Sequence, residues 1–314
     1  MTETLTEPYS DEKKALPARS AIRRYAVDRV IIPYLFLLPG LIIYTWFTII
    51  PVVNTLLLSL YNWDGISPST FAGFGNFIDL FINDSIFIRS FVNSFIFVIY
   101  YAIIPIIVAL LLSTLMTRRQ IRGLTAFRTI LFIPYTLALV VVAIAWRWLY
   151  LPDGPINQVL KLIGLGFLTR PWLGDFTFAL HSIGMVASWV MYGLPMVLFI
   201  AGIQKISRDL YDAARVDGAG PFQEFLHVTL PGLTGELTVV ASLTLIYAMR
   251  SFDLVFTMTR GGPGYSTYTP ALFMYLNAFQ YGTVGKGAAI AAIITLINFF
   301  LVLLVTRLIG ERGQ

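Results

Sequence analysis

Long stretches without charged residues alternate with short polar connections along the chain. The five clearest charge-free stretches are 30–63, 90–117, 129–146, 176–204 and 287–306. Each provides, fully or nearly, the roughly 20 apolar residues that a helix needs to cross hydrocarbon. A sixth apolar stretch, 237–259, is interrupted by Arg250 and Asp253. The pattern predicts an all-α, polytopic membrane protein with six transmembrane helices.

We expect the membrane domain to cover residues 30–309, between an N-terminal tail, 1–29, and a short C-terminus, 310–314. The expected spans lie at about 32–61, 88–116, 124–149, 176–203, 233–258 and 287–307. The uncharged segment 261–285 is not counted, because its opening GGPGYSTYTP would leave backbone groups unpaired in lipid. It predicts an external loop followed by a short interfacial helix near 271–279.

Composition supports a membrane protein. Of the 314 residues, 57% are hydrophobic and 12% are charged, whereas a soluble domain has about 25% charged residues. The same values exclude a disordered chain. There is no cysteine, which excludes disulfides and thiolate metal sites. We expect no cofactor and no metal site.

The basic residues predict the orientation. Of the 22 Lys and Arg residues, 15 fall in the tail, the second-to-third connection, the fourth-to-fifth connection and the C-terminal end. Basic residues accumulate on the cytoplasmic side, so both termini are predicted to be cytoplasmic, in a plasma (inner) membrane of bacterial or archaeal type. The net charge of +5 then needs no nucleic-acid partner.

The fourth-to-fifth connection, within 205–232, carries strong helix signals. Ser207 is a good N-cap, and Gly218 can end the first helix in a left-handed conformation. Pro221 can begin a second helix, on which Phe222 and Phe225 form an apolar stripe. The local pattern fits an amphipathic helix at the membrane interface, or a surface on which a partner docks.

This stretch resembles the "EAA" cytoplasmic loop of ABC importer permeases, in their carbohydrate-uptake branch. The matching residues are Asp212, Ala213, Ala214, Asp217, Gly218, Ala219, Phe225, Val228, Leu230 and Pro231. Weaker matches occur in the expected order over about 33–309, among them FRTILFIP at 127–134 and FDLVFTMTRGGPG at 252–264. The departure is Asp212, where the family usually has Glu.

The resemblance implies a transport subunit rather than an enzyme. It implies a second, related permease, two separate ATP-binding cassette ATPase subunits that dock through 207–231, and an extracytoplasmic solute-binding protein. No phosphate-binding loop is present in this chain. Phe222 joins the matched residues as a coupling candidate. The implied cargo is a sugar or related polyol, and the residues do not distinguish saccharides from polyols or glycerol-phosphate-like solutes.

Solute contacts are predicted at polar and aromatic side chains within spans. The candidates are Asn93, Trp189, Tyr192, Tyr247, Phe252, Asp253 and Asn298. For the aromatics ordinary packing competes with this role, and for the two asparagines an interhelical hydrogen bond does. Asp253 is expected either to pair with Arg250 on the same helix face or to face the pathway. The segment Gly261, Gly262, Pro263 and Gly264 is predicted to form part of the binding-protein platform, together with 152–175.

The alternative is a secondary transporter of a small polar solute, driven by an ion gradient. Such a protein is expected to carry several intramembrane carboxylates or two repeated halves. Asp253 is the only convincing intramembrane acid in the sequence, and no duplication is visible.

Overall fold

The computed structural model describes residues 32–118 and 123–310, in two compact units, 1–54 and 55–314, which are described separately. The first unit leads into a continuous helical segment, Ile32–Leu58. It consists of α2 (Ile32–Tyr44), the π-helical turn η2 (Thr45–Ile49) and α3 (Ile50–Leu58). None of its side chains is buried. The expected tail 1–29 and the end 311–314 lie outside the described residues.

The second unit begins with a two-residue antiparallel pairing of β1 (Tyr61–Asn62) with β2 (Thr70–Phe71), followed by α4 (Gly75–Ile82). One long helix follows, composed of α5 (Ser85–Val98), the π-helical turn η3 (Ile99–Ile103) and α6 (Ile104–Arg118). Next come α7 (Leu124–Thr136) and α8 (Leu139–Leu149), which are bent by 91° relative to each other. The sequence predicted a single helix there, at 124–149. The two residues between them, Leu137 and Ala138, are extended.

The second half has the same alternation of apolar helices and connections. Its elements are α9 (Pro155–Leu162), the 3-10 turn η4 (Gly166–Leu168), α10 (Phe178–Met191), α11 (Gly193–Ile203), α12 (Arg208–Val216), α13 (Pro221–Glu224), the π-helical turn η5 (Phe225–Thr229), α14 (Leu230–Gly232), α15 (Thr234–Met249), α16 (Asp253–Met258), α17 (Pro270–Phe279), α18 (Val284–Val305) and the π-helical turn η6 (Thr306–Gly310). Among the described residues, five helices are long and apolar enough to cross a membrane, and the bent α7–α8 pair makes a sixth. The all-α fold with six apolar spans is therefore confirmed.

Three of the π-helical turns have a common cause. Pro51, Pro105 and Pro231 each lie two residues beyond such a turn. In each case the residue before the proline donates its N–H to the carbonyl five residues earlier, as Ile104 does to Ile99. Proline lacks an N–H and its ring collides with the carbonyl four residues back, so the helix widens locally. The prolines thus shape these helices without ending them.

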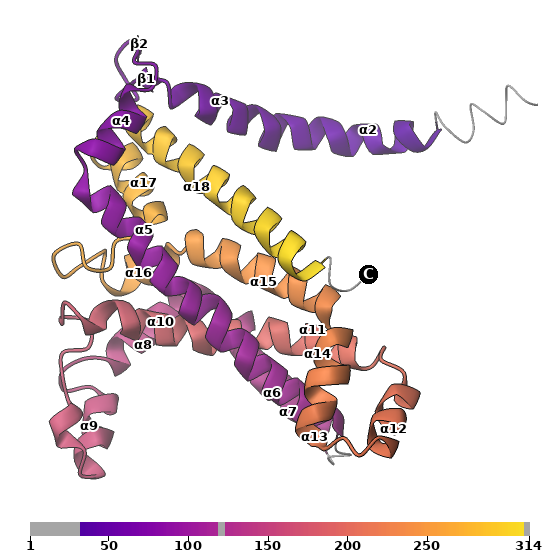
Figure 1. The fold of residues 1–314 in the computed structure, drawn as a ribbon. Coiled ribbons are helices and arrows are strands. Elements are labelled where there is room, and N and C mark those ends of the chain that lie inside the picture. The colour runs from indigo at the N-terminus through magenta and orange to yellow at the C-terminus, as the bar shows by residue number, and fades with distance from the viewer. Residues whose placement is uncertain (1–31, 119–122, 311–314) are drawn as a thin grey trace, which may run out of the picture. The chain divides into compact units, whose positions relative to one another are not determined.

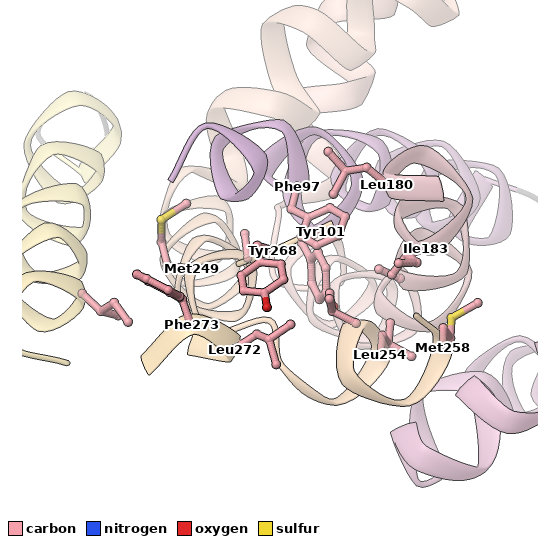
Figure 2. Packing of buried hydrophobic residues seen from close by; sticks show 14 of the residues in the cluster. Phe97, Tyr101, Leu180, Ile183, Met249, Leu254, Met258, Tyr268, Leu272 and Phe273 are labelled. Atoms are coloured by element: carbon pink, nitrogen blue, oxygen red, sulfur yellow. The ribbon is translucent and has the colours of Figure 1, made fainter. Parts of the chain in front are cut away.

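The elements of the second unit extend between two ends (Figure 1). At one end lie α9, the connection between α16 and α17, and the β1–β2 pair; at the other lie α12, α13 and the end of α18. The main core is formed by residues of α4, α5, η3, α8, α10, α15, α16, α17 and α18. Figure 2 shows the Tyr268 ring projecting among residues of this core, including Tyr101, Leu272 and Phe273.

An ion-pair cluster joins α4, α5 and α18. Lys286 Nζ lies 2.9 Å from Asp79 Oδ2 and 2.9 Å from Asp84 Oδ2. The hydrogen bond from Lys286 lowers the pKa of the Asp79 carboxyl below its usual value. Asp84 Oδ1 also accepts the Phe87 N–H and caps α5. Because Lys286 has these partners it lies inside α18, which begins at Val284, three residues before the sequence-based boundary.

Candidate functional site

The connection between α11 and α15, residues 207–231, forms a two-helix elbow. Ser207 Oγ accepts the Asp209 N–H at 3.3 Å and caps α12. Gly218, at φ +81°, ends this helix, and the N–H groups of Gly218 and Ala219 reach back to the carbonyls of Arg215 and Ala214 at 3.0 and 2.9 Å. These bonds satisfy carbonyls that the helix end would leave free. The predicted N-cap and left-handed stop are confirmed.

The second helix of the elbow also begins as the sequence predicts. Pro221 is its first residue, and the Gly220 N–H donates to Gln223 Oε1 at 2.8 Å. α13 is only one turn long and continues into the π-helical turn η5, which Pro231, two residues further on, induces. The two phenylalanines of the predicted apolar stripe differ in exposure: Phe222 is 72% exposed, whereas Phe225 is half-buried.

The elbow presents most of the coupling candidates at its surface. Six are exposed in this chain: Asp212, Ala213, Asp217, Gly218, Phe222 and Pro231. Four are half-buried: Ala214, Ala219, Phe225 and Leu230. Val216, which the motif does not include, is 89% exposed. The structure therefore gathers polar and apolar side chains on an exposed elbow at one end of the second unit (Figure 1).

Asp212 already has a partner within this chain. Its Oδ1 accepts a hydrogen bond from Arg215 Nη1 at 3.2 Å, and both side chains are more than half exposed. Exposed pairs at this spacing contribute little to stability, about 0.3–0.5 kcal/mol. The Asp212 carboxylate can therefore exchange this partner for a basic group of another protein at small cost.

One solute candidate lines a recess between bent helices. Tyr247 of α15 lies there with Tyr135 at the end of α7 and Leu194 near the start of α11. The full lining is Tyr135, Met191, Leu194, Pro195, Val240, Leu243, Thr244 and Tyr247. The walls are mainly apolar, with hydroxyl groups from two tyrosines and one threonine. Sequence analysis missed Tyr135 and Thr244; the Pro134–Tyr135 pair next to a helix break was the available signal.

The aromatic candidates take different positions. Tyr192 lies at the junction of α10 and α11, half-buried. Trp189 is 37% exposed and its ring centroid lies 5.6 Å from that of Trp146. Phe252 stacks on Phe256 at 5.1 Å, with an interplanar angle of 14°. Phe252 therefore already has an aromatic neighbour.

The two asparagine candidates make internal contacts. Asn93 is 5% exposed, and its amide nitrogen donates to the carbonyls of Ser266 and Tyr268 at 3.0 and 2.8 Å. It holds the connection after α16, so we assign it to support of that connection. Asn298 donates to the Ile294 carbonyl of its own helix at 3.1 Å, while its Oδ1 is buried without a hydrogen-bond partner.

The expected pairing of Asp253 with Arg250 on one helix face is wrong. α15 ends at Met249 and α16 begins at Asp253, so Arg250 lies in the break before the helix that carries Asp253. Among the described ion pairs, none joins them. Both side chains are exposed in this chain. The Ser251 side chain in the break bonds Tyr101 Oη at 3.0 Å, and its carbonyl accepts Thr269 Oγ1 at 2.7 Å.

The Gly-rich connection, which we term the 259–269 loop, is largely buried within the chain. Thr267 and Thr269 have no exposed surface, and Tyr268 is 6% exposed. Of the four platform candidates, Gly261 is buried, Gly262 and Pro263 are half-buried, and Gly264 is exposed. The loop is held inward because Asn93 of α5 donates to its Ser266 carbonyl, and because Thr259 and Thr267 share a hydrogen bond within the loop.

The neighbouring connection, 152–175, is organised by a buried asparagine. Asn157, 1% exposed, donates to the carbonyls of Pro152 and Arg170, both at 2.9 Å, and accepts Trp172 Nε1 at 2.8 Å. Asp175 accepts the N–H groups of Phe178 and Thr177, and these bonds lower the pKa of its carboxyl. Leu162, 85% exposed, and Phe167, 77% exposed, are left at the surface.

The chain is similar to known transport proteins over most of its length. It is 37% identical over 278 residues to the probable ABC transporter permease protein YurN of Bacillus subtilis, covering 87% of this chain and 94% of that protein. It is 32% identical over 314 residues to the diacetylchitobiose uptake system permease protein NgcF of Streptomyces coelicolor, covering 95% of this chain and 89% of that protein. It is 30% identical over 269 residues to the lactose transport system permease protein LacF of Rhizobium radiobacter, covering 85% of this chain and 89% of that protein.

The fold is also found in a solved structure. A chain of a bacterial ABC transporter that imports the acidic polysaccharide alginate superposes with a TM-score of 0.77, at 21% identity, covering 93% of this chain and all of that one. No family model matches the chain. The identity to YurN over nearly the whole length, with six apolar spans, shows that this chain is a multi-pass membrane protein of the ABC transporter permease family.

Proposed function

We propose that this chain forms half of the translocation pathway for a sugar or related polyol. A second, related permease forms the other half, and two separate ATPase subunits power the cycle. The observation that carries the proposal is the capped and exposed elbow, 207–231, at one end of the second unit. Relatives described as diacetylchitobiose, lactose and trehalose/maltose permeases support a saccharide cargo.

The recess between α7, α11 and α15 is the best candidate for part of the solute path. Discontinuous helices in transporters commonly border the substrate site near the bilayer centre. The Tyr135 and Tyr247 rings provide apolar faces for a sugar ring, and their hydroxyl groups provide hydrogen-bonding groups, whereas the Thr244 hydroxyl donates to the Val240 carbonyl of its own helix. We propose Tyr135 and Tyr247 as contacts in the path, with Tyr192 and Asp253 as secondary candidates.

The predicted orientation places the elbow and both termini in the cytoplasm. The elbow and the end of α18 lie at the same end of the second unit (Figure 1), which agrees with the basic residues Lys205, Arg208 and Arg307 found there. The opposite end carries α9 and the exposed tip of the 259–269 loop, Gly264 and Tyr265. We propose these as contacts for an extracytoplasmic solute-binding protein, such as the periplasmic protein seen with the alginate transporter.

The experiment is purification of the tagged chain in mild detergent, identification of the co-purifying subunits and reconstitution into vesicles. A panel of lactose, trehalose, diacetylchitobiose, arabino-oligosaccharides and glycerol is then screened for stimulation of ATP hydrolysis. We expect uptake that requires ATP and the ATPase subunits. Gly218→Asp adds a charge at the turn of the elbow and is expected to abolish uptake and ATPase docking.

The same vesicles test the alternative. Accumulation by the isolated chain under a proton or sodium gradient, without nucleotide, would refute the proposal in favour of a secondary transporter. YurN, NgcF and LacF are all described as permease proteins of ABC transporters or of uptake and transport systems, and none supports the ion-gradient alternative.

A further inference from the structure

Two polar contacts join the helices of the elbow. Tyr211 and Arg215, four residues apart, lie on one face of α12. Tyr211 Oη lies 3.0 Å from Thr229 Oγ1 of η5, and Arg215 Nε donates to Glu224 Oε1 of α13 at 3.1 Å. The first helix is therefore held to the second at two points, near the middle and near the C-terminal end of α12.

The Arg215 contact reaches a buried carboxylate. Glu224 is 6% exposed, whereas the Arg215 side chain is 60% exposed. A charged carboxylate withdrawn from water needs hydrogen-bonded, oppositely charged neighbours, and the planar guanidinium can provide more than one bond. Arg215 also bonds Asp212, so a single side chain links the exposed surface of α12 to the interior of the elbow.

The base of the elbow is fixed to the spans. Lys205, just after α11, pairs with Glu236 in the first turn of α15 at 2.9 Å. Between α14 and α15, Leu233 has no exposed surface. A Cβ added to Gly232 would come within 2.6 Å of Ile206, so the two ends of the elbow pack closely.

We propose that Arg215 is a positioning residue which, with Tyr211, makes α12 and the α13–η5 segment one rigid body. This inference rests on the proposed function, in which an ATPase subunit docks on the exposed face of α12. A displacement of that face then moves Thr229 and the start of α15 with it, because the two helices do not slide past each other. Flexible helices would dissipate the displacement before it reached the spans.

The first test uses Arg215→Gln with Arg208→Gln as the matched control. Both remove one positive charge from α12, but Arg208 lies at the first position of the helix and has no described ion pair. The measurement is solute taken up per ATP hydrolysed by the reconstituted complex, with the panel solute that stimulates hydrolysis most. Changes along a coupling path typically alter coupling by about 2-fold to 30-fold. We expect R215Q to lower the solute taken up per ATP by a factor in this range. R208Q should leave this ratio close to that of the wild type. Equal ratios for the two variants would overturn the inference.

The second test replaces the Tyr211–Thr229 hydrogen bond by a covalent link. The chain has no cysteine, so the pair Tyr211→Cys and Thr229→Cys carries the only thiols in this subunit. A short bifunctional thiol reagent is needed, because the tyrosine side chain spans most of the gap. Because the double variant lacks the Tyr211–Thr229 hydrogen bond, a rigid elbow predicts that cross-linking maintains or raises uptake per ATP relative to the same variant before cross-linking. Loss of uptake on cross-linking, absent from the single-cysteine controls, would show that the helices must move relative to each other and would overturn the inference.

The two proposals fail in different ways. If wild-type uptake needs no ATPase subunit, the proposed function fails. If wild-type uptake is ATP-dependent and G218D abolishes it, but R215Q behaves as R208Q does or the cross-linked pair loses uptake, only the rigid elbow is refuted.

Discussion

The elbow and the 259–269 loop share a composition but differ in their surroundings. Both are rich in glycine, proline and polar residues, and both connect two helices. The elbow is largely exposed, and all of its described side-chain bonds stay within 18 residues of sequence. The 259–269 loop is mostly buried, and two of its carbonyls accept bonds from Asn93, 173 and 175 residues away.

The difference shows what turn-forming residues indicate. Gly and Pro mark where a chain turns, but whether the turn meets water depends on partners for its backbone groups. In the elbow, water and caps provide them. In the 259–269 loop, Asn93 and the hydroxyl groups of Thr259 and Thr267 provide them. Substitutions in the elbow should therefore affect coupling, while those in the loop should affect stability.

The largest expected effect is that of Gly261→Ala. Gly261 has φ +91°, and an added Cβ would lie 2.4 Å from Tyr268 Cε2, within the core. Left-handed strain and overpacking together should cost about 3–5 kcal/mol. The measurement is the thermal unfolding midpoint of the purified protein in detergent. An unchanged midpoint would contradict the buried arrangement of the loop.

Asn93→Ala should have the next largest effect. Removal of the amide leaves the Ser266 and Tyr268 carbonyls without this donor, at an expected cost of about 2–4 kcal/mol. Asn83→Ala is the matched control, since the described side-chain hydrogen bond of Asn83 is an exposed one to Asp79. Thermal unfolding should separate the two variants clearly; equal midpoints would mean that Asn93 does not hold the loop.

Gly218→Ala tests the elbow with the same substitution as Gly261→Ala. Gly218 has φ +81°, but among the described residues no atom beyond its chain neighbours lies within 4 Å of an added Cβ. Only the left-handed backbone disfavours alanine, at about 1 kcal/mol. The unfolding midpoint should fall much less than for the Gly261 variant. A comparable fall would show that the elbow is packed as tightly as the loop.

Phe222→Ala should leave stability almost unchanged, within about 0.5 kcal/mol, because the side chain is 72% exposed. Yield of co-purified ATPase subunits should nevertheless fall, since an exposed aromatic on the elbow is a candidate anchor. Phe279→Ala, at an equally exposed phenylalanine in α17, serves as control. Undiminished ATPase recovery with F222A would exclude Phe222 from the docking surface.

Local signals in the sequence determined several features of this protein. Charge-free length predicted the apolar helices, because lipid excludes unpaired charge. Ser207, Gly218 and Pro221 predicted the limits of the elbow helices, because caps and stops act on their own turns. The spacing around Asp212 and Gly218 indicated the family.

Only the tertiary structure decided the features that depend on distant partners. The 91° bend between α7 and α8 and the recess beside Tyr135 arise where several broken helices meet. Lys286 lies inside α18 because Asp79 and Asp84 neutralise it. The 259–269 loop is buried because Asn93 lies beside it in space. Periodicity and capping act within a few residues, whereas hydrogen bonds and ion pairs between helices join positions that no local pattern connects.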